Sequence, residues 1–141
     1  MAVIYLQISI FLSILIAMIH ADKEKYKDIL EDSVTYLEQH GFENIKVDSE
    51  GYETPKSYSK KGSDISITPD IVATKEGKKH YFDISLKSAA PKLLKSKWLF
   101  LNTLTALKSS HFRLITTRGH YKFTAEMLDD INLNNKKLIK I

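Results

Sequence analysis

The chain has no cysteine, few glycines and no closely spaced histidines, and each of these absences removes a class of site. Without cysteine there is no disulfide framework, no thiolate metal centre and no cysteine nucleophile. The five histidines lack the paired spacing of a zinc site. Only five glycines are present and they do not cluster, which excludes a glycine-rich phosphate loop. The 141 residues suffice for one domain with a modest core.

Charge is unevenly distributed along the chain. Residues 1–53 hold four Lys and ten acidic residues, a net charge of −6, whereas residues 54–141 hold seventeen Lys or Arg and seven acidic residues, a net charge of +10. A basic region of this kind attracts a polyanion such as DNA. A general lysine bias of the genome would also raise this count, so the charge supports DNA as a partner without establishing it.

Residues 1–19 carry no charge and are long enough to span a bilayer. The favoured interpretation is a membrane anchor, and the lysines that follow it would keep the rest of the chain on the cytoplasmic side. A signal peptide and a translation start at Met18 are the alternatives, although the basic residues that open a signal peptide are missing. We therefore expect a hydrophobic N-terminal segment over residues 1–21 and one folded domain over residues 22–141.

Two short segments, residues 68–74 and 81–87, are rich in β-branched and aromatic residues, and a polar turn separates them. They predict an antiparallel hairpin. Alternation along the second strand places Asp83, Ser85 and Lys87 on one face, and pairing would bring Asp70 beside Asp83. Two adjacent carboxylates repel one another unless a cation lies between them, and oxygen ligands suit magnesium. An exposed cross-turn ion pair of Asp83 and Lys87, with Asp70 in the turn, is the structural alternative.

Pro69-Asp70, followed by Asp83 in a strand that leads to Lys87, resembles the motif of the PD-(D/E)XK nuclease superfamily, in particular its small archaeal-type Holliday junction resolvases and other short phage or repair nucleases. The order helix, strand, basic loop, hairpin, helix, strand over residues 22–118 is similar to the family core. The family places its lysine two residues after the second acid, where this chain has Ser85. Lys87 follows one strand repeat later on the same face.

The resemblance implies a restriction-endonuclease-like core and a DNA endonuclease that depends on Mg²⁺ or Mn²⁺ and acts as a dimer. Asp70, Asp83 and the backbone carbonyl of Ile84 would hold the metal, while Lys87 would orient the attacking water or stabilise developing charge. Glu31, on a helix expected over residues 22–40, would be a third metal-shell acid. A solvated acidic helix face is the alternative for Glu31.

The loop over residues 51–61 alternates tyrosines and lysines, a composition suited to phosphate and base contacts. A merely flexible loop is the alternative. The resemblance adds a small hydroxyl residue just after this loop, and an arginine follows the last strand of the core. The expected DNA contacts are Lys56, Tyr58, Lys60, Lys61, Ser63 and Arg118.

Periodicity completes the expected fold as α/β, a mixed but mainly antiparallel central sheet of about four strands flanked by helices. Gly41 should end the first helix of the domain, and Pro91 fits the first turn of a helix over residues 90–110. The leading functional hypothesis is a divalent-metal-dependent endonuclease. The alternative is a catalytically decayed nucleic-acid-binding or membrane-tethered module of the same fold.

Overall fold

The computed structural model describes residues 2–25, 27–59, 61–62 and 64–141, and within them the chain forms an α/β fold around a five-stranded sheet of order β1-β4-β5-β6-β7. The strands of this sheet are β1 (Glu43–Val47), β4 (Ile71–Lys75), β5 (Lys78–Ser85), β6 (His111–Thr116) and β7 (Leu138–Lys140). The helices are α1 (Ala2–Lys25), α2 (Lys27–Gln39), α3 (Pro91–Leu107) and α4 (Tyr121–Asp130). A separate two-stranded arm pairs β2 (Tyr58–Ser59) with β3 (Ser66–Ile67).

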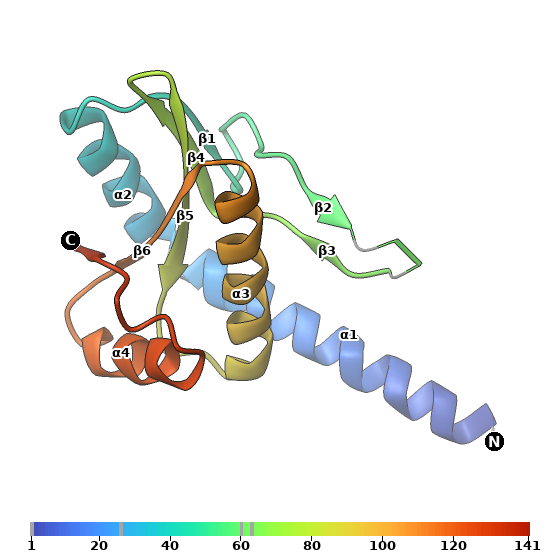
Figure 1. The fold of residues 1–141 in the computed structure, drawn as a ribbon. Helices are drawn as coiled ribbons and strands as arrows, with labels where there is room; N and C mark the ends of the chain where they lie inside the picture. Colours follow the sequence, from blue (N-terminus) through green and yellow to red (C-terminus); the bar gives the residue numbers. More distant parts are fainter. Residues whose placement is uncertain (1, 26, 60, 63) are drawn as a thin grey trace.

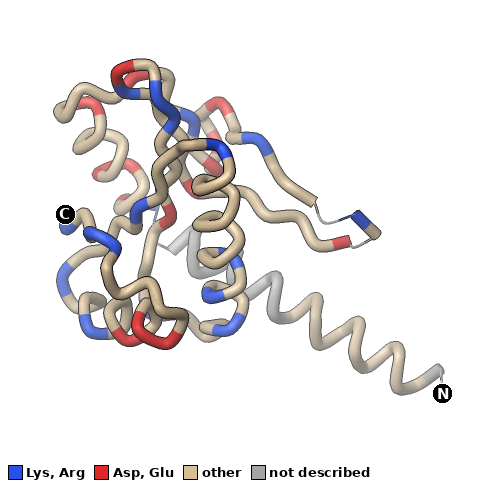
Figure 2. Tube along the Cα trace, in the orientation of Figure 1, with Lys and Arg blue, Asp and Glu red and all other residues tan. Residues whose placement is uncertain are grey.

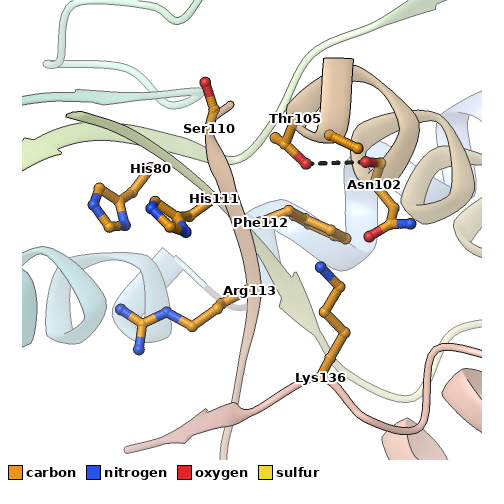
Figure 3. A pocket seen from close by; sticks show the side chains of 9 residues that line it. His80, Asn102, Thr105, Ser110, His111, Phe112, Arg113 and Lys136 are labelled. Atoms are coloured by element: carbon orange, nitrogen blue, oxygen red, sulfur yellow. Dashed lines mark hydrogen bonds between the residues drawn. The ribbon is translucent and has the colours of Figure 1, made fainter. Parts of the chain in front are cut away.

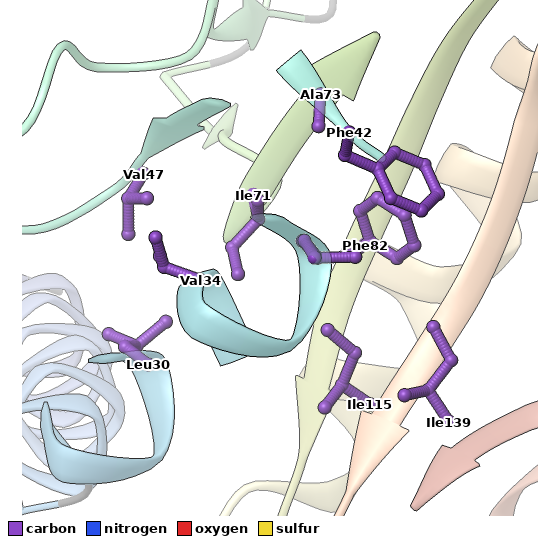
Figure 4. Close-up of a cluster of buried hydrophobic side chains, with 10 residues drawn as sticks. Leu30, Val34, Phe42, Val47, Ile71, Ala73, Phe82, Ile115 and Ile139 are labelled. Carbon is purple, nitrogen blue, oxygen red and sulfur yellow. The ribbon is translucent and has the colours of Figure 1, made fainter. Parts of the chain in front are cut away.

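The sheet is covered on both faces, by α2 on one and by α3 and α4 on the other (Figure 1). Side chains alternate along β5, so that Tyr81 enters the cluster beneath α3 and α4 while Phe82 enters the cluster beneath α2. Figure 4 shows the second of these clusters, in which Phe82 lies against residues of α2, β1 and β4. Adjacent residues of one strand therefore serve two separate cores.

The direction of the strands corrects our sequence prediction. Pairs β1–β4 and β4–β5 are antiparallel, but β5–β6 and β6–β7 are parallel, with α3 and α4 as the crossover helices. The expected α/β class and mixed sheet are thus confirmed, whereas the sheet has five strands rather than about four and is not mainly antiparallel. The lysine-rich terminal segment, which carried no predicted strand, contains β7, whose one fully core residue is Ile139.

The predicted hairpin is confirmed as β4 and β5, with Ile71 opposite Phe82 in the register. Glu76 and Gly77, both at positive φ, form the tight connection. Helix ends also follow the sequence signals. Gly41, at φ +83°, ends α2, and the amide of Phe42 donates to the carbonyl of Leu37.

The predicted helix over residues 22–40 is divided in the structure between the end of α1 and α2, and Tyr26 lies outside the described residues. Helix α1 extends away from the sheet in Figure 1, and its apolar side chains between Val3 and Ile14 are exposed. In the part of the chain that is described, no helix combines the length and the apolar character needed to cross a membrane. The anchor over residues 1–19 stays a prediction from the sequence.

Candidate active site

Two carboxylates meet where the start of β4 lies beside the second half of β5. Asp70 and Asp83 lie at equivalent positions of the hairpin, one residue beyond the Ile71–Phe82 pair. The backbone amide of Asp70 donates to Oδ1 of Asp83 at 3.2 Å, and the amide of Ile84 donates to Oδ2 of Asp70 at 2.8 Å. The hairpin thus holds the two acids together through its own backbone, as the sequence predicted.

The cation that joins these carboxylates comes from helix α3. Nζ of Lys97 lies 2.7 Å from Oδ1 of Asp83 and 3.4 Å from Oδ1 of Asp70. The side chain of Lys97 is 14% exposed, against 5% for Asp70 and 0% for Asp83. Because buried charges require partners, the ammonium is a principal compensation for the two acids. Of the three side chains, Lys97 is the most exposed.

The next residue of α3 holds the second oxygen of Asp83. The indole Nε1 of Trp98 donates to Oδ2 of Asp83 at 2.8 Å, and the Trp98 side chain is fully buried. Asp83 therefore accepts from the Asp70 amide, from Lys97 and from Trp98. Trp98 therefore belongs to the core, and its indole N–H adds a polar contact that the sequence did not reveal.

Lys87 does not occupy the position expected of it. Strand β5 ends at Ser85, so Lys87 lies two residues beyond the strand and is exposed. Its backbone amide donates to Nδ1 of His120 at 2.9 Å. Among the described contacts, the ammonium next to the two carboxylates is that of Lys97. Lys97 therefore replaces Lys87 as the candidate for the lysine that the resemblance places beside the two acids.

Ser85, which stands where the family motif has lysine, belongs to a buried hydroxyl cluster. Its Oγ lies 2.6 Å from Oγ1 of Thr124 on α4, and Thr116 donates to the Ser85 carbonyl at 2.8 Å. Oγ1 of Thr124 also lies 3.3 Å from Oγ1 of Thr116. All three side chains are fully buried. A small hydroxyl residue at position 85 therefore allows α4 to pack against the ends of β5 and β6.

Glu31 is not brought to the carboxylates. It is exposed on α2, the helix that covers the opposite face of the sheet from α3. Ile84, by contrast, is adjacent to Asp83, and its amide binds Asp70, which places its backbone at the centre of the cluster.

The expected DNA contacts are only partly described. Lys60 and Ser63 lie outside the described residues, whereas Lys56, Lys61 and Arg118 are exposed, as a phosphate contact requires. Tyr58 is half-buried. Its hydroxyl lies 3.3 Å from that of Tyr81, and burial together with this hydrogen bond raises the pKa of Tyr81 to about 12.

The ring of Tyr58 also ties the β2–β3 arm to α3. Lys56 and Lys108 lie over this ring, at 5.5 Å and 5.4 Å from its centroid, and the Phe100 ring is 5.9 Å away. Tyr58 therefore serves the docking of the arm as well as any contact with a ligand. Figure 2 shows lysines along this arm and at the start of α3.

The donors of the cluster fit a magnesium-type ion better than zinc. Within the described residues no group of three His, Cys, Asp or Glu side chains converges on one point. Magnesium is commonly held by one or two carboxylates, and water and substrate phosphate oxygens complete the shell. The Oδ1 atoms of Asp70 and Asp83 both contact the ammonium of Lys97, so these two oxygens are the carboxylate donors that the cluster brings together.

Sequence reasoning missed Lys97 although a signal was present. Three lysines, Lys92, Lys95 and Lys97, crowd the first turns of α3. Lys95 pairs with Asp130 at 2.8 Å, and Lys92 is exposed, which leaves Lys97 as the one directed at the carboxylates.

Comparison of the chain with protein-family models, with curated proteins and with solved structures found no match in any of the three.

Proposed function

We propose that the protein is a divalent-metal-dependent endonuclease that hydrolyses phosphodiesters in DNA, with branched or structured DNA as one candidate substrate. The observation that carries this proposal is the joint contact of Lys97 with Asp70 and Asp83. Two acids and one lysine on a hairpin and the following helix form the combination of charges that phosphodiester cleavage needs. The basic residues 54–141 supply the attraction for DNA.

In this function Asp70, Asp83 and the Ile84 carbonyl would hold Mg²⁺ or Mn²⁺. Such an ion would supply Lewis acidity and lower the pKa of an attacking water. Lys97 stabilises the negative charge that develops on the phosphate, because its ammonium lies directly beside both carboxylates. Trp98 and the Asp70 amide fix the orientation of Asp83. Lys56, Lys61 and Arg118 bind the DNA backbone.

Cleavage assays test this proposal. The purified protein is incubated with plasmid, linear and four-way-junction DNA in magnesium, in manganese and in EDTA. We expect metal-dependent cutting that is lost in Asp83→Asn and kept in Glu126→Gln, an exposed acid on α4 that serves as the matched control. Circular dichroism verifies that both variants are folded. Equal residual cutting by wild type and Asp83→Asn would overturn the proposal.

One observation favours a second function, a nucleic-acid-binding module without catalysis. Asp83 is fully buried, both of its oxygens are engaged, and Lys97 already supplies a positive charge without a metal. In that case Lys97 is a permanent substitute for the metal. DNA affinity would fall with rising salt, as phosphate contacts require, and would not depend on magnesium or on Asp83. The sequence-based anchor would make this module a membrane-tethered one.

A further inference from the structure

A second group of basic and polar side chains lines a cavity of about 430 Å³ at the edge of the sheet. Its lining comes from β5, the second half of α3, the start of β6 and the segment before β7 (Figure 3). The side chains that matter here are His80, Thr105, Ser110, His111, Arg113 and Lys136. His111 is exposed, so the cavity is accessible from solvent.

The cavity lies where one strand edge is uncovered. Strand β7 pairs with β6 only from Leu114 to Thr116, so residues 111–113 have no neighbouring strand on that side in the described sheet. Figure 3 shows His80, His111 and Arg113 on one side of β6, with Lys136 on the other side and its amine directed toward Phe112. A ligand at this edge lies within the field of cations from both sides.

The positive charges of this cavity are not neutralised by the protein. No acidic side chain lines it, and in the described part of the chain neither Arg113 nor Lys136 forms an ion pair. Their closest recorded partners are aromatic rings, with Arg113 5.6 Å from the Phe82 centroid and Lys136 5.6 Å from that of Phe112. Burial lowers the pKa of Lys136. A bound anion would offset that desolvation.

The stacked imidazole rings of His80 and His111 include one buried nitrogen without a hydrogen-bond partner among the described residues. The rings of His80 and His111 stack with centroids 4.7 Å apart, and Nδ1 of His80 is buried with no hydrogen-bond partner among the described residues. Buried polar atoms are normally satisfied, so an unpaired one in a cavity wall indicates a missing partner. Burial, and then the positive charges of His111, Arg113, Lys75 and Lys78, lower the pKa of His80 to about 4. An anion would relieve this repulsion.

We propose that this cavity binds a phosphate-bearing ligand. Guanidinium and ammonium groups are the side chains that bind phosphate best, and Arg113 and Lys136 bring one of each to this cavity. The volume is larger than one phosphate needs and falls within the usual range of small-molecule sites.

This site is separate from the proposed nuclease centre. His80 precedes Asp83 by three residues of β5, which is about 10 Å along a strand. Thr105 follows Lys97 by eight residues of α3, about 12 Å along a helix. The phosphate can belong to a free nucleotide or to a DNA strand, and the experiment separates these two sources.

The test is carried out in EDTA, so that it does not depend on cleavage. Inorganic phosphate is titrated against the full-length protein, and sodium chloride of equal ionic strength serves as the control. We expect phosphate to raise the thermal midpoint beyond the chloride effect and to shift the ring C–H signals of His80 and His111 in NMR spectra. If phosphate acts no more strongly than chloride and both histidine signals stay in place, the proposal is overturned.

Substitutions in the cavity show where phosphate binds. Their effect on phosphate affinity is measured in EDTA and is independent of DNA cleavage. Arg113→Gln and Lys136→Gln should each weaken apparent phosphate affinity on the order of tenfold. Lys122→Gln, an exposed lysine on α4, removes the same charge elsewhere and should bind like wild type. Unchanged affinity in both Arg113→Gln and Lys136→Gln would contradict the assignment.

Two competitors identify the source of the phosphate. Thymidine monophosphate that displaces inorganic phosphate, while a short oligothymidylate does not, assigns the site to a free nucleotide-like ligand. Displacement by the oligonucleotide, lost in Arg113→Gln or Lys136→Gln, assigns it to the backbone of bound DNA. The histidine signals of the wild-type protein report both competitions, so the result stands even where a variant folds poorly.

Discussion

Trp98 donates its indole N–H to the buried carboxylate of Asp83 at 2.8 Å, and this bond fixes the position of α3 relative to the hairpin. The preceding residue, Lys97, contacts the other oxygen of the same carboxylate at 2.7 Å. Consecutive residues of one helix therefore bind both oxygens of one acid. The first predictions follow from this arrangement.

Replacement of Lys97 separates the catalytic role from the structural one. Lys97→Met keeps the length of the side chain but removes its charge, and we expect DNA cleavage to fall about 100-fold or more because charge stabilisation at the phosphate is lost. Lys87→Met is the matched control, since this exposed lysine lies beyond β5. Single-turnover cleavage measures both variants. A larger loss in Lys87→Met than in Lys97→Met would return the assignment to Lys87.

Lys97→Met should also change the effect of Mg²⁺ or Mn²⁺ on the thermal midpoint. Without the ammonium, the carboxylates of Asp70 and Asp83 remain together in a buried site. The free energy of unfolding of Lys97→Met should therefore fall by roughly 3–5 kcal/mol. Mg²⁺ or Mn²⁺ should therefore raise the thermal midpoint of Lys97→Met more than that of wild type. A metal effect of equal size in both proteins would indicate that the ion does not bind at these carboxylates.

Trp98→Phe removes one hydrogen bond and keeps most of the aromatic volume. Oδ2 of Asp83 then loses its indole donor in a buried position, and we expect the free energy of unfolding to fall by about 1–3 kcal/mol. Urea unfolding measures this loss. In a double-mutant cycle with Asp83→Asn, the two effects should be strongly non-additive, and simple additivity would show that the bond contributes nothing.

Position 85 should not accept the lysine of the family motif. Ser85→Lys places an ammonium into the buried cluster with Thr116 and Thr124, and we expect loss of cooperative folding, while Ser85→Ala should cost only about 1–2 kcal/mol. The exchange Ser85→Lys with Lys87→Ser therefore should not restore or raise cleavage. Thermal unfolding and DNA cleavage of the exchanged protein check this, and a stable, active exchange variant would contradict the packing argument.

Stability should decrease in mild acid because of His80. Its pKa of about 4 in the folded protein lies below the ordinary value of 6.5, so the unfolded chain binds more protons between these two pH values. The contribution of neutral His80 to the free energy of unfolding is complete above pH 6.5 and is lost as the pH falls toward 4. The groups that oppose protonation are His111, Arg113, Lys75 and Lys78.

His80→Gln supplies the comparison. Glutamine does not titrate, so the difference in thermal midpoint between wild type and variant should shrink, or reverse, between pH 6.5 and pH 4. Carboxylate titration affects both proteins and cancels in the difference. A difference that stays constant over this range would show that His80 titrates alike in the folded and unfolded states.

The hairpin and the two helix ends were predictable because their signals are local. The acids at Asp70 and Asp83, the turn at Gly77 and the cap at Gly41 each depend on neighbours within a few residues. Asp83 also interrupts an apolar part of β5, where a buried acid requires partners. These local features do not depend on how distant parts of the chain pack against one another.

Lys97 and β7 were not predictable in the same way. Which lysine of α3 faces the carboxylates depends on the rotation of that helix over the sheet, and Trp98 sets this rotation through a contact fifteen residues away in sequence. Strand β7 has only three residues and exists through parallel pairing with β6. Its local sequence, rich in lysine and asparagine, is typical of a tail.

The crossover helix α3 has a consequence for the order in which the chain assembles. The β4–β5 hairpin is local and can close within microseconds, yet by itself it brings two carboxylates together without a cation. Their repulsion opposes the isolated hairpin until α3 docks and delivers Lys97, and the parallel β5–β6 pair forms only once that helix has crossed over. The proposed catalytic charges thereby link a local turn to a distant helix, so that the hairpin and the crossover stabilise each other and fold as one cooperative unit.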